Sequence, residues 1–279
     1  MQTHVFIAIL AAALLHAGWN SIVKLDLDRR ISVLLLAIVQ AIVALPILPF
    51  VQQPTSAAWG WIATAALLHT GYKIFLVEAY ARVDLSQAYP LARGSAPLLV
   101  TLFSVFVLGE TFDSASLLGI GLISTGVFLM AVKGGHIDRI QGMALFFVVG
   151  TAGFTASYTL VDGIGARIAG TSSGFILWMV IGDAIGMIFY TLMTTGSVAF
   201  RRLKPSWKTG PAAGLMSLGS YWIAVWAFTQ APIALVASLR ETSILFAILI
   251  SAFVLGENVS RWRWAAGIAI FAGVVSIKA

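Results

Sequence analysis

The sequence predicts an all-helical protein that crosses a membrane many times. Its composition, its long apolar runs and an internal repeat all support this fold class. The 279 residues are 59% hydrophobic and 10% charged, whereas a soluble domain usually carries about 25% charged residues. So few charges could not cover the surface of a water-soluble fold of this length. The composition therefore indicates a polytopic membrane protein.

Composition also limits the chemistry that the chain can perform. The absence of cysteine excludes disulfide bonds, thiolate catalysis and Cys-ligated metal sites. The net charge is +6, but no segment combines a soluble basic face with aromatic residues, so nucleic acid is not an expected partner. The stretch GTSSG, Gly170 to Gly174, matches a serine-nucleophile pattern but lacks the strand that this pattern requires before it. We therefore expect no enzyme, no metal and no cofactor.

A helix needs about 20 mostly apolar residues to cross the hydrocarbon core of a membrane. Ten segments meet this requirement and leave no room for a soluble domain. They are His4–Val23, Ile31–Phe50, Ala57–Ala81, Ser86–Leu108, Ser114–Val132, Gln141–Val161, Ser172–Thr195, Pro211–Thr229, Ile233–Leu255 and Arg261–Ile277.

The charges between these segments predict an orientation. Intervals after odd-numbered segments, together with the first residues of the tenth segment, carry 12 Lys and Arg residues, and the opposite side carries only Arg167 and Lys278. Basic residues concentrate on the cytoplasmic side of membrane proteins. The asymmetry predicts both termini on the non-cytoplasmic side of a bacterial-type inner membrane.

A repeat divides the chain into two halves, 1–135 and 136–279. The pentapeptide FVLGE begins at Phe106 and again at Phe253, 147 positions later, and Arg93 and Arg240 have the same spacing. Each half contains five predicted helices, an odd number, so the second half enters the membrane from the opposite face. This predicts an inverted-topology repeat, in which a substrate site lies near the midplane between the halves.

Gly and Glu end the repeated pentapeptide. Gly permits the turn that ends a helix, and Glu can reach the aqueous interface. We interpret Glu110 and Glu257 as structural residues rather than coupling residues.

Two five-helix halves, each with a fourth helix that ends in F-x-LGE before a Gly-rich fifth helix, resemble the EamA-type family of the drug/metabolite transporter superfamily. The stretch ALLHAGWNSIVK, Ala13 to Lys24, also resembles the first helix of such proteins. The resemblance covers essentially the whole chain. It implies a ten-helix inner-membrane carrier, more often an exporter, with a central cavity between the halves. It implies neither a substrate nor a catalytic residue.

Charged residues inside the predicted spans are the main candidate site residues, because a charge at the bilayer centre costs about 2.5–3.5 kcal/mol. Arg93 and Arg240 occupy equivalent places and could contact an anionic group of the substrate. The alternative is structural ion pairing with Glu241 or Glu78. Both interpretations stay open on sequence alone.

Two further pairs each share a helix face, because their members are four residues apart. His69 and Lys73 could hold a substrate anion between them, or Lys73 could pair with an acid from another helix. His16 and Asn20, with Trp19 nearby, could bind substrate or form hydrogen bonds between helices.

The remaining candidates are acids and aromatic residues. Glu78, Asp183 and Glu241 are candidate carboxylates for proton coupling. Tyr89, Tyr158, Tyr221 and Trp222 could line the cavity, although such aromatic side chains also occur in protein cores and interfacial belts.

The function predicted is a secondary transporter in the lipid bilayer. It would move a small polar metabolite, amino-acid-like or carrying an anionic group, and protons are one candidate driving ion. Nine Trp and seventeen Phe residues favour an alternative, the efflux of amphipathic drugs. A membrane-embedded enzyme acting on lipid-linked substrates would need a nucleophile or a metal set, and the sequence shows neither. A passive scaffold would not explain the buried charges. The sequence does not indicate an oligomeric state.

Overall fold

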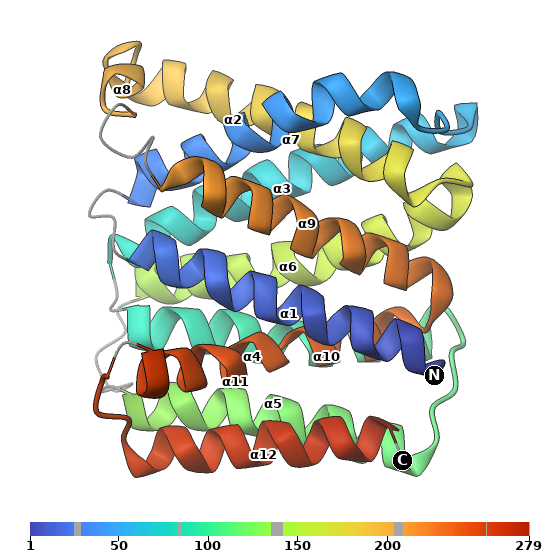
Figure 1. The fold of residues 1–279 in the computed structure, drawn as a ribbon, viewed down its shortest axis with the longest axis vertical. Helices are drawn as coiled ribbons and strands as arrows, with labels where there is room; N and C mark the ends of the chain where they lie inside the picture. The colour runs from blue at the N-terminus through green and yellow to red at the C-terminus, as the bar shows by residue number, and fades with distance from the viewer. Residues whose placement is uncertain (25–28, 83–84, 135–141, 204–208, 255, 279) are drawn as a thin grey trace.

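The computed structural model describes residues 1–24, 29–82, 85–134, 142–203, 209–254 and 256–278. At residues 23–24, 29, 85–92 and 131–134 the description covers the backbone only. All regular elements in the described part are helices (Figure 1). This agrees with the predicted all-α class.

The helices are long rods that run back and forth across the molecule (Figure 1). They are α1 (Thr3–Lys24), α2 (Arg29–Ile47), η1 (Leu48–Phe50), η2 (Ser56–Ala58), α3 (Trp59–Tyr80), α4 (Leu85–Phe106), α5 (Ser114–Gly134), α6 (Gly142–Ala169), α7 (Ser172–Thr194), α8 (Val198–Arg201), α9 (Gly210–Gln230), α10 (Ile233–Arg240), α11 (Thr242–Leu249), the π-helical η5 (Ile250–Val254) and α12 (Arg261–Lys278).

Six helical segments in the described part are long and apolar enough to cross a membrane. They are Thr3–Ile22, Arg30–Phe50, Gly142–Ala169, Ser172–Thr194, Gly210–Gln230 and Ile233–Val254. Two shorter apolar stretches, Arg93–Phe106 and Ser114–Met130, lie in α4 and α5. The protein is therefore a multi-pass membrane protein.

The expected end of the sixth segment at Val161 is wrong. Helix α6 continues for eight further residues to Ala169, and Gly170 ends it with a φ of +69°. No proline interrupts this stretch, so the helix has no reason to stop earlier. Asp162, expected just beyond the helix, lies inside it.

The ninth predicted segment, Ile233–Leu255, agrees with the apolar span Ile233–Val254, but this span contains a break. The backbone N–H of Glu241 donates to Ser238 O at 3.0 Å, which is three residues earlier in the chain rather than the four of an α-helix. This tighter turn separates α10 from α11. Arg240 and Glu241 lie at this junction. Broken helices free backbone groups and redirect side chains at membrane depth.

The two FVLGE copies end their helices in the same way. Gly109 and Gly256 have φ values of +67° and +65°. The N–H of Glu110 donates to Ser104 O, and that of Glu257 to Ser251 O, both at 2.9 Å. The prediction that the glycine permits a turn is confirmed at both sites.

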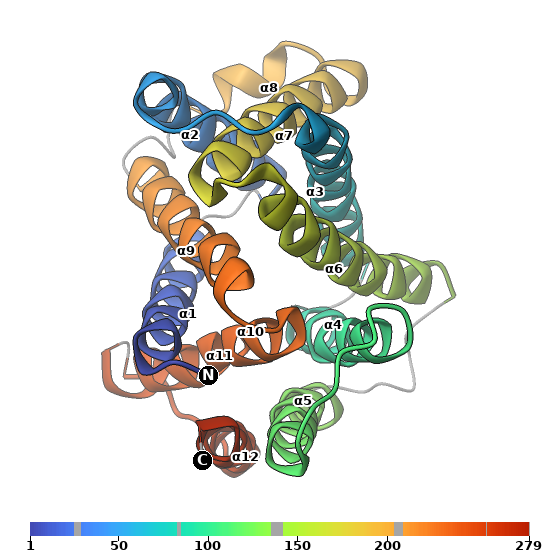
Figure 2. The same cartoon turned by 90° about the vertical axis from the view of Figure 1, so that its right-hand side faces the viewer.

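Helices far apart in the sequence lie side by side (Figure 2). Helix α1 packs against α9, α3 against α6, α2 against α7, and α5 against α12. Small residues allow the last pair to approach closely, because a Cβ added at Gly119 would lie 2.7 Å from Gly273 O.

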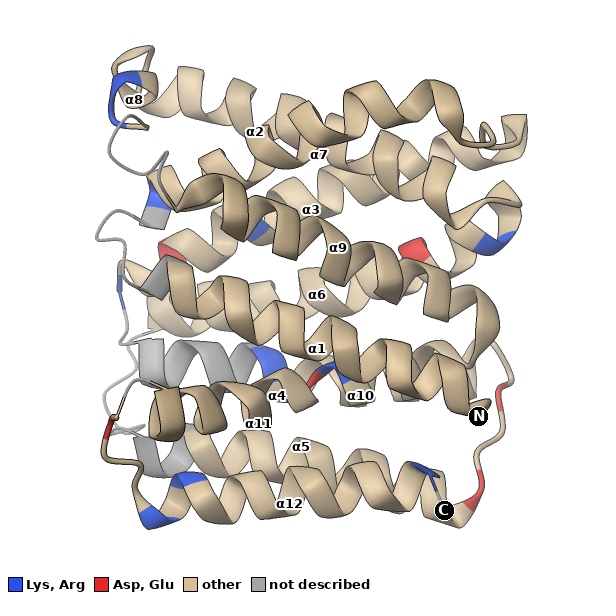
Figure 3. Cartoon of the chain, in the orientation of Figure 1, with Lys and Arg blue, Asp and Glu red and all other residues tan. Residues whose placement is uncertain are grey.

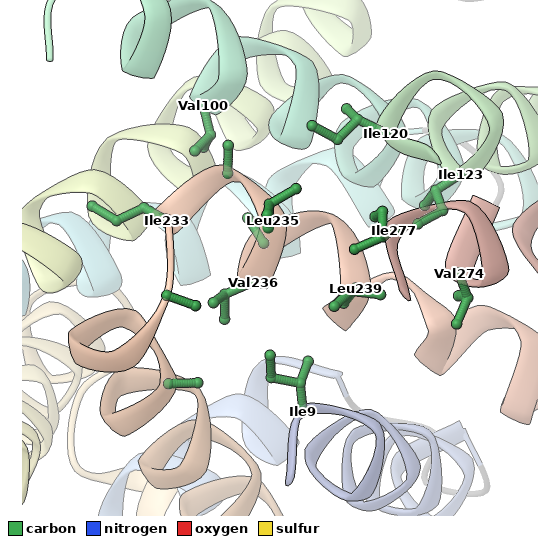
Figure 4. Packing of buried hydrophobic residues seen from close by; sticks show 14 of the residues in the cluster. Ile9, Val100, Ile120, Ile123, Ile233, Leu235, Val236, Leu239, Val274 and Ile277 are labelled. Atoms are coloured by element: carbon green, nitrogen blue, oxygen red, sulfur yellow. The ribbon is translucent and has the colours of Figure 1, made fainter. Parts of the chain in front are cut away.

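Helix α10 packs into an apolar cluster formed with several neighbouring helices. Figure 4 shows Ile233, Leu235, Val236 and Leu239 of α10 among side chains of α1, α4, α5 and α12. Burial of these side chains stabilises the position of α10. The junction that follows α10 is therefore held by packing on several sides.

Charged residues on the described helices gather mostly at the ends of the rods. Figure 3 shows Lys and Arg on α8 and at the beginning of α12, at the end of the molecule opposite both termini. A few charges lie along the rods, on α3, α4, α6 and the α10–α11 junction. These interior charges form the candidate site.

Candidate functional site

A cavity of about 100 Å³ lies among the helices and is lined by residues of α1, α2, α3, α4, α6, α7, α9 and α10. Nine of the fourteen predicted site residues line it. They are His16, Trp19, His69, Lys73, Arg93, Tyr158, Asp183, Tyr221 and Arg240. The structure thus brings together residues from both halves of the sequence.

Lys73 is neutralised by an acid of α7. Its Nζ forms a salt bridge with Asp183 Oδ2, and Thr70 Oγ1 donates to Asp183 Oδ1 at 3.2 Å. Asp183 is 2% exposed. The geometry of Lys73 therefore agrees with the second interpretation, an ion pair with an acid from another helix.

Arg93 is neutralised by an acid of the broken helix. Its Nε donates to Glu241 Oε2 at 3.1 Å, and its Nη2 lies 3.0 Å from Glu241 Oε1. Both side chains are 5% exposed. This two-pronged geometry is the strongest arrangement for an Arg–carboxylate pair.

Arg240 differs from the other two bases. It is 8% exposed, and its guanidinium carbon lies 4.8 Å from the centroid of the Tyr221 ring. Among the described residues, no carboxylate lies within ion-pair distance of it, and its guanidinium donates no hydrogen bond. A buried cation without an anionic partner is costly. An anion placed beside Arg240 would lower this cost.

Two further groups on α1 face the same cavity. The indole Nε1 of Trp19 is buried and has no hydrogen-bond partner in the described part of the chain. The His16 ring contacts the Trp19 ring edge to face, with 5.0 Å between centroids. Both side chains can donate hydrogen bonds to an oxyanion.

A second polar group lies behind the cavity, around Asp162. Its Oδ2 is 2.9 Å from His69 Nε2 and accepts a hydrogen bond from the Tyr221 hydroxyl. The His69 ring stacks on Tyr158 with 4.1 Å between centroids. Asp162 is completely buried. Sequence reasoning missed this acid because it ended the helix at Val161, one residue before Asp162, although the apolar run through Ala169 could have revealed it.

Five predicted residues do not line the cavity. Asn20 donates to the backbone of its own helix, at His16 O, and Trp222 donates to Ser173. Glu78 lies near the end of α3, paired with Arg30 and Arg82. The remaining two are Glu241, which lies behind Arg93, and Tyr89, whose side chain is outside the described residues.

Gln40 and Ser217 are polar lining residues that were not among the predicted site residues. Gln40 Nε2 donates to Ser217 Oγ at 3.0 Å, which links α2 to α9 across the cavity wall. The signal for Gln40 was a single amide within the apolar run of the second segment.

Charge around the cavity is nearly balanced. The bases are Lys73, Arg93 and Arg240, and the acids are Asp162, Asp183 and Glu241. Two acids are used in direct ion pairs with a Lys or Arg, and Asp162 contacts a His and a Tyr instead. The cavity therefore combines one cation that has no acidic partner among the described residues with aromatic walls and hydrogen-bond donors.

Comparison with known proteins agrees with this architecture. Residues 4–132 match the model of the EamA-like transporter family. A solved structure described only as "Crystal structure of protein" is similar with a TM-score of 0.80 and 16% sequence identity, and the likeness covers 99% of this chain and 98% of that chain. At this identity the likeness concerns the fold alone. A comparison with curated proteins gives no match.

Proposed function

The chain belongs to the EamA-type family of transporters, and on this premise we propose that it is a secondary transporter for a small polar metabolite with an anionic group. The observation that carries the proposal is Arg240, a buried cation that lines the cavity without an acidic partner among the described residues. An anion at Arg240 would also meet the hydrogen-bond donors of Trp19 and His16. Amino acids and organic anions are the substrate classes with the required group.

The transport cycle that we propose depends on two inverted five-helix repeats, 1–135 and 136–279, with ten membrane spans. The contacts support it, because α1 with α9 and α3 with α6 are the pairs that such a repeat relates to each other. The matched turns at Gly109 and Gly256 also support it. Rocking of one repeat against the other would open the cavity to each side in turn.

Orientation and location follow from the charges. The 12 basic residues after odd-numbered segments support a cytoplasmic position for that end. Both termini would then face the non-cytoplasmic side of a bacterial-type inner membrane. Export is the direction that we propose from the family resemblance.

Efflux of amphipathic drugs is the second candidate function. It is favoured by the aromatic part of the cavity wall, which comprises Trp19, Tyr72, Tyr158 and Tyr221. Aromatic faces attract organic cations, and a drug site of this kind would not need Arg240.

Reconstitution in proteoliposomes tests the two candidates. We would measure exchange of labelled glutamate, lactate and isethionate, which each carry a net charge of −1, beside exchange of the amphipathic cation ethidium. The proposal predicts saturable exchange of at least one anion, with a strong loss in Arg240→Gln. Saturable ethidium transport without exchange of any of the three anions would contradict it and support drug efflux.

A further inference from the structure

Asp162 is a buried acid that does not itself line the cavity. Its side chain is fully buried, and Oδ1 has no hydrogen-bond partner in the part of the chain that the structure describes. Buried carboxylate oxygens are normally hydrogen-bonded. Protonation would relieve the cost of an ionised carboxylate with one unsatisfied oxygen. The local structure of Asp162 therefore suits a site that binds and releases a proton.

His69 and Tyr221 connect Asp162 with the cavity. Both contact Asp162 Oδ2, and both line the cavity, which Asp162 itself does not. An imidazole has two nitrogens and a phenol has one hydroxyl, so either group can pass a proton on. Protons therefore have a route between the cavity and Asp162.

Tyr221 also connects Asp162 with Arg240. The Tyr221 hydroxyl donates to Asp162, and the guanidinium of Arg240 lies over the ring of the same side chain at 4.8 Å. The carboxylate of Asp162 and the guanidinium of Arg240 thus both contact the side chain of Tyr221. In a site of low dielectric constant, charges that contact the same side chain influence each other more strongly than they would in water.

We propose that Asp162 takes up a proton when an anion binds at Arg240, so that the carrier moves one proton together with each monoanion. This inference rests on the proposed function and adds the coupling ion and the residue that carries it. An anion at Arg240 offsets the positive charge that Arg240 presents to Asp162 across the Tyr221 side chain. A proton from the cavity water then adds to Asp162 through His69 or Tyr221, and it leaves by the same route on release. No bond of the substrate is broken.

Of the charged and titratable groups around Asp162, Arg240 is the one whose charge an incoming anion would neutralise. They are His16 of α1, His69, Tyr72 and Lys73 of α3, Arg93 of α4, Tyr158 and Arg167 of α6, Asp183 of α7, Tyr221 of α9, Arg240 of α10 and Glu241 at the α10–α11 junction. Lys73 and Arg93 keep their acidic partners, and Arg167 donates to carbonyl oxygens of Phe228 and Ala231. Anion binding changes the electrostatic environment of Asp162 chiefly through Arg240.

The test compares exchange with proton-driven accumulation in the same proteoliposomes. The probe is whichever of glutamate, lactate and isethionate gives the largest saturable exchange. For the wild type we expect an imposed pH gradient to drive accumulation, with about one proton per monoanion measured by an internal pH dye. Asp162→Asn keeps the size and one acceptor oxygen of the side chain. It should retain at least half of the exchange rate but lose at least nine-tenths of the accumulation.

Glu78→Gln is the matched control, because Glu78 lies outside the cavity and should be dispensable for both activities. Anion exchange by the wild type without proton movement would overturn this inference and leave the proposed function intact. Accumulation that survives in Asp162→Asn would overturn it as well. Absence of exchange with all three anions would instead overturn the proposed function. A wild-type proton ratio near zero overturns the inference whether or not Asp162→Asn folds.

Discussion

Arg93 and Arg240 occupy equivalent positions in the repeated sequence but have different surroundings. Glu241 follows Arg240 directly, yet it forms its ion pair with Arg93. The position equivalent to Glu241 in the first half, 147 residues earlier, is Gly94. Glu241 therefore pairs with Arg93, whereas Arg240 lines the cavity without an acidic partner among the described residues. A repeated residue can thus keep its position in the sequence while its two copies have different partners, and our proposal assigns the anion to the copy without an acid.

Loss of Arg93 should have the largest effect on stability. Arg93→Gln leaves Glu241 buried without its cationic partner, which should lower the free energy of unfolding by about 3–5 kcal/mol. Denaturant unfolding of the purified protein in detergent would measure this. The double variant Arg93→Gln/Glu241→Gln should recover most of the loss, and an equally unstable double variant would contradict the assigned pairing.

Loss of Arg240 should instead affect binding. Arg240→Gln removes charge-assisted hydrogen bonds to the anion, each worth about 1.5–3 kcal/mol, so the KM for the exchanged anion should rise about 10- to 100-fold. Stability should not fall, because the cation that is removed is buried and has no acidic partner among the described residues. An unchanged KM together with a large loss of stability would reverse the roles of the two arginines.

Tyr221 tests how Arg240 is held. Tyr221→Phe removes the hydroxyl that donates to Asp162 but keeps the ring below Arg240. We expect a loss of about 1–2 kcal/mol in the free energy of unfolding and a KM within about threefold of wild type by the proteoliposome assay. Tyr221→Leu, which also removes the ring, should raise the KM further. Equal KM values for the two variants would show that the ring does not position Arg240.

The same Gly→Ala substitution should lower stability equally at the two matched turns, whereas the two arginines should respond differently to replacement by Gln. Gly109→Ala and Gly256→Ala each place a Cβ at a positive φ, which costs about 1 kcal/mol. No heavy atom outside the chain neighbours lies within 4 Å of either added Cβ, so no clash adds to this cost. Unfolding measurements should give the same loss for both, and a clear difference would argue against equivalent structures at the two helix ends.

Much of the fold was predictable from the sequence, because helix positions depend on apolar length and on glycine turns. The turns at Gly109 and Gly256 are local features, and the sequence pattern predicted both. The pairing of Arg93 with Glu241 joins residues 148 positions apart, and no local pattern contains that information. Asp162 was missed for a related reason: the apolar run before it was already long enough for a membrane span, so the continuation of α6 went unnoticed.

The most direct test of the central claim is the KM of the exchanged anion in Arg240→Gln and in Arg93→Gln/Glu241→Gln, measured side by side in proteoliposomes. The double variant removes one positive and one negative charge, so the net charge of the site is unchanged. We predict that its KM stays within about threefold of the wild-type value, whereas Arg240→Gln raises the KM at least about tenfold. An increase in the double variant as large as that in Arg240→Gln would contradict the claim that only Arg240 receives the anion.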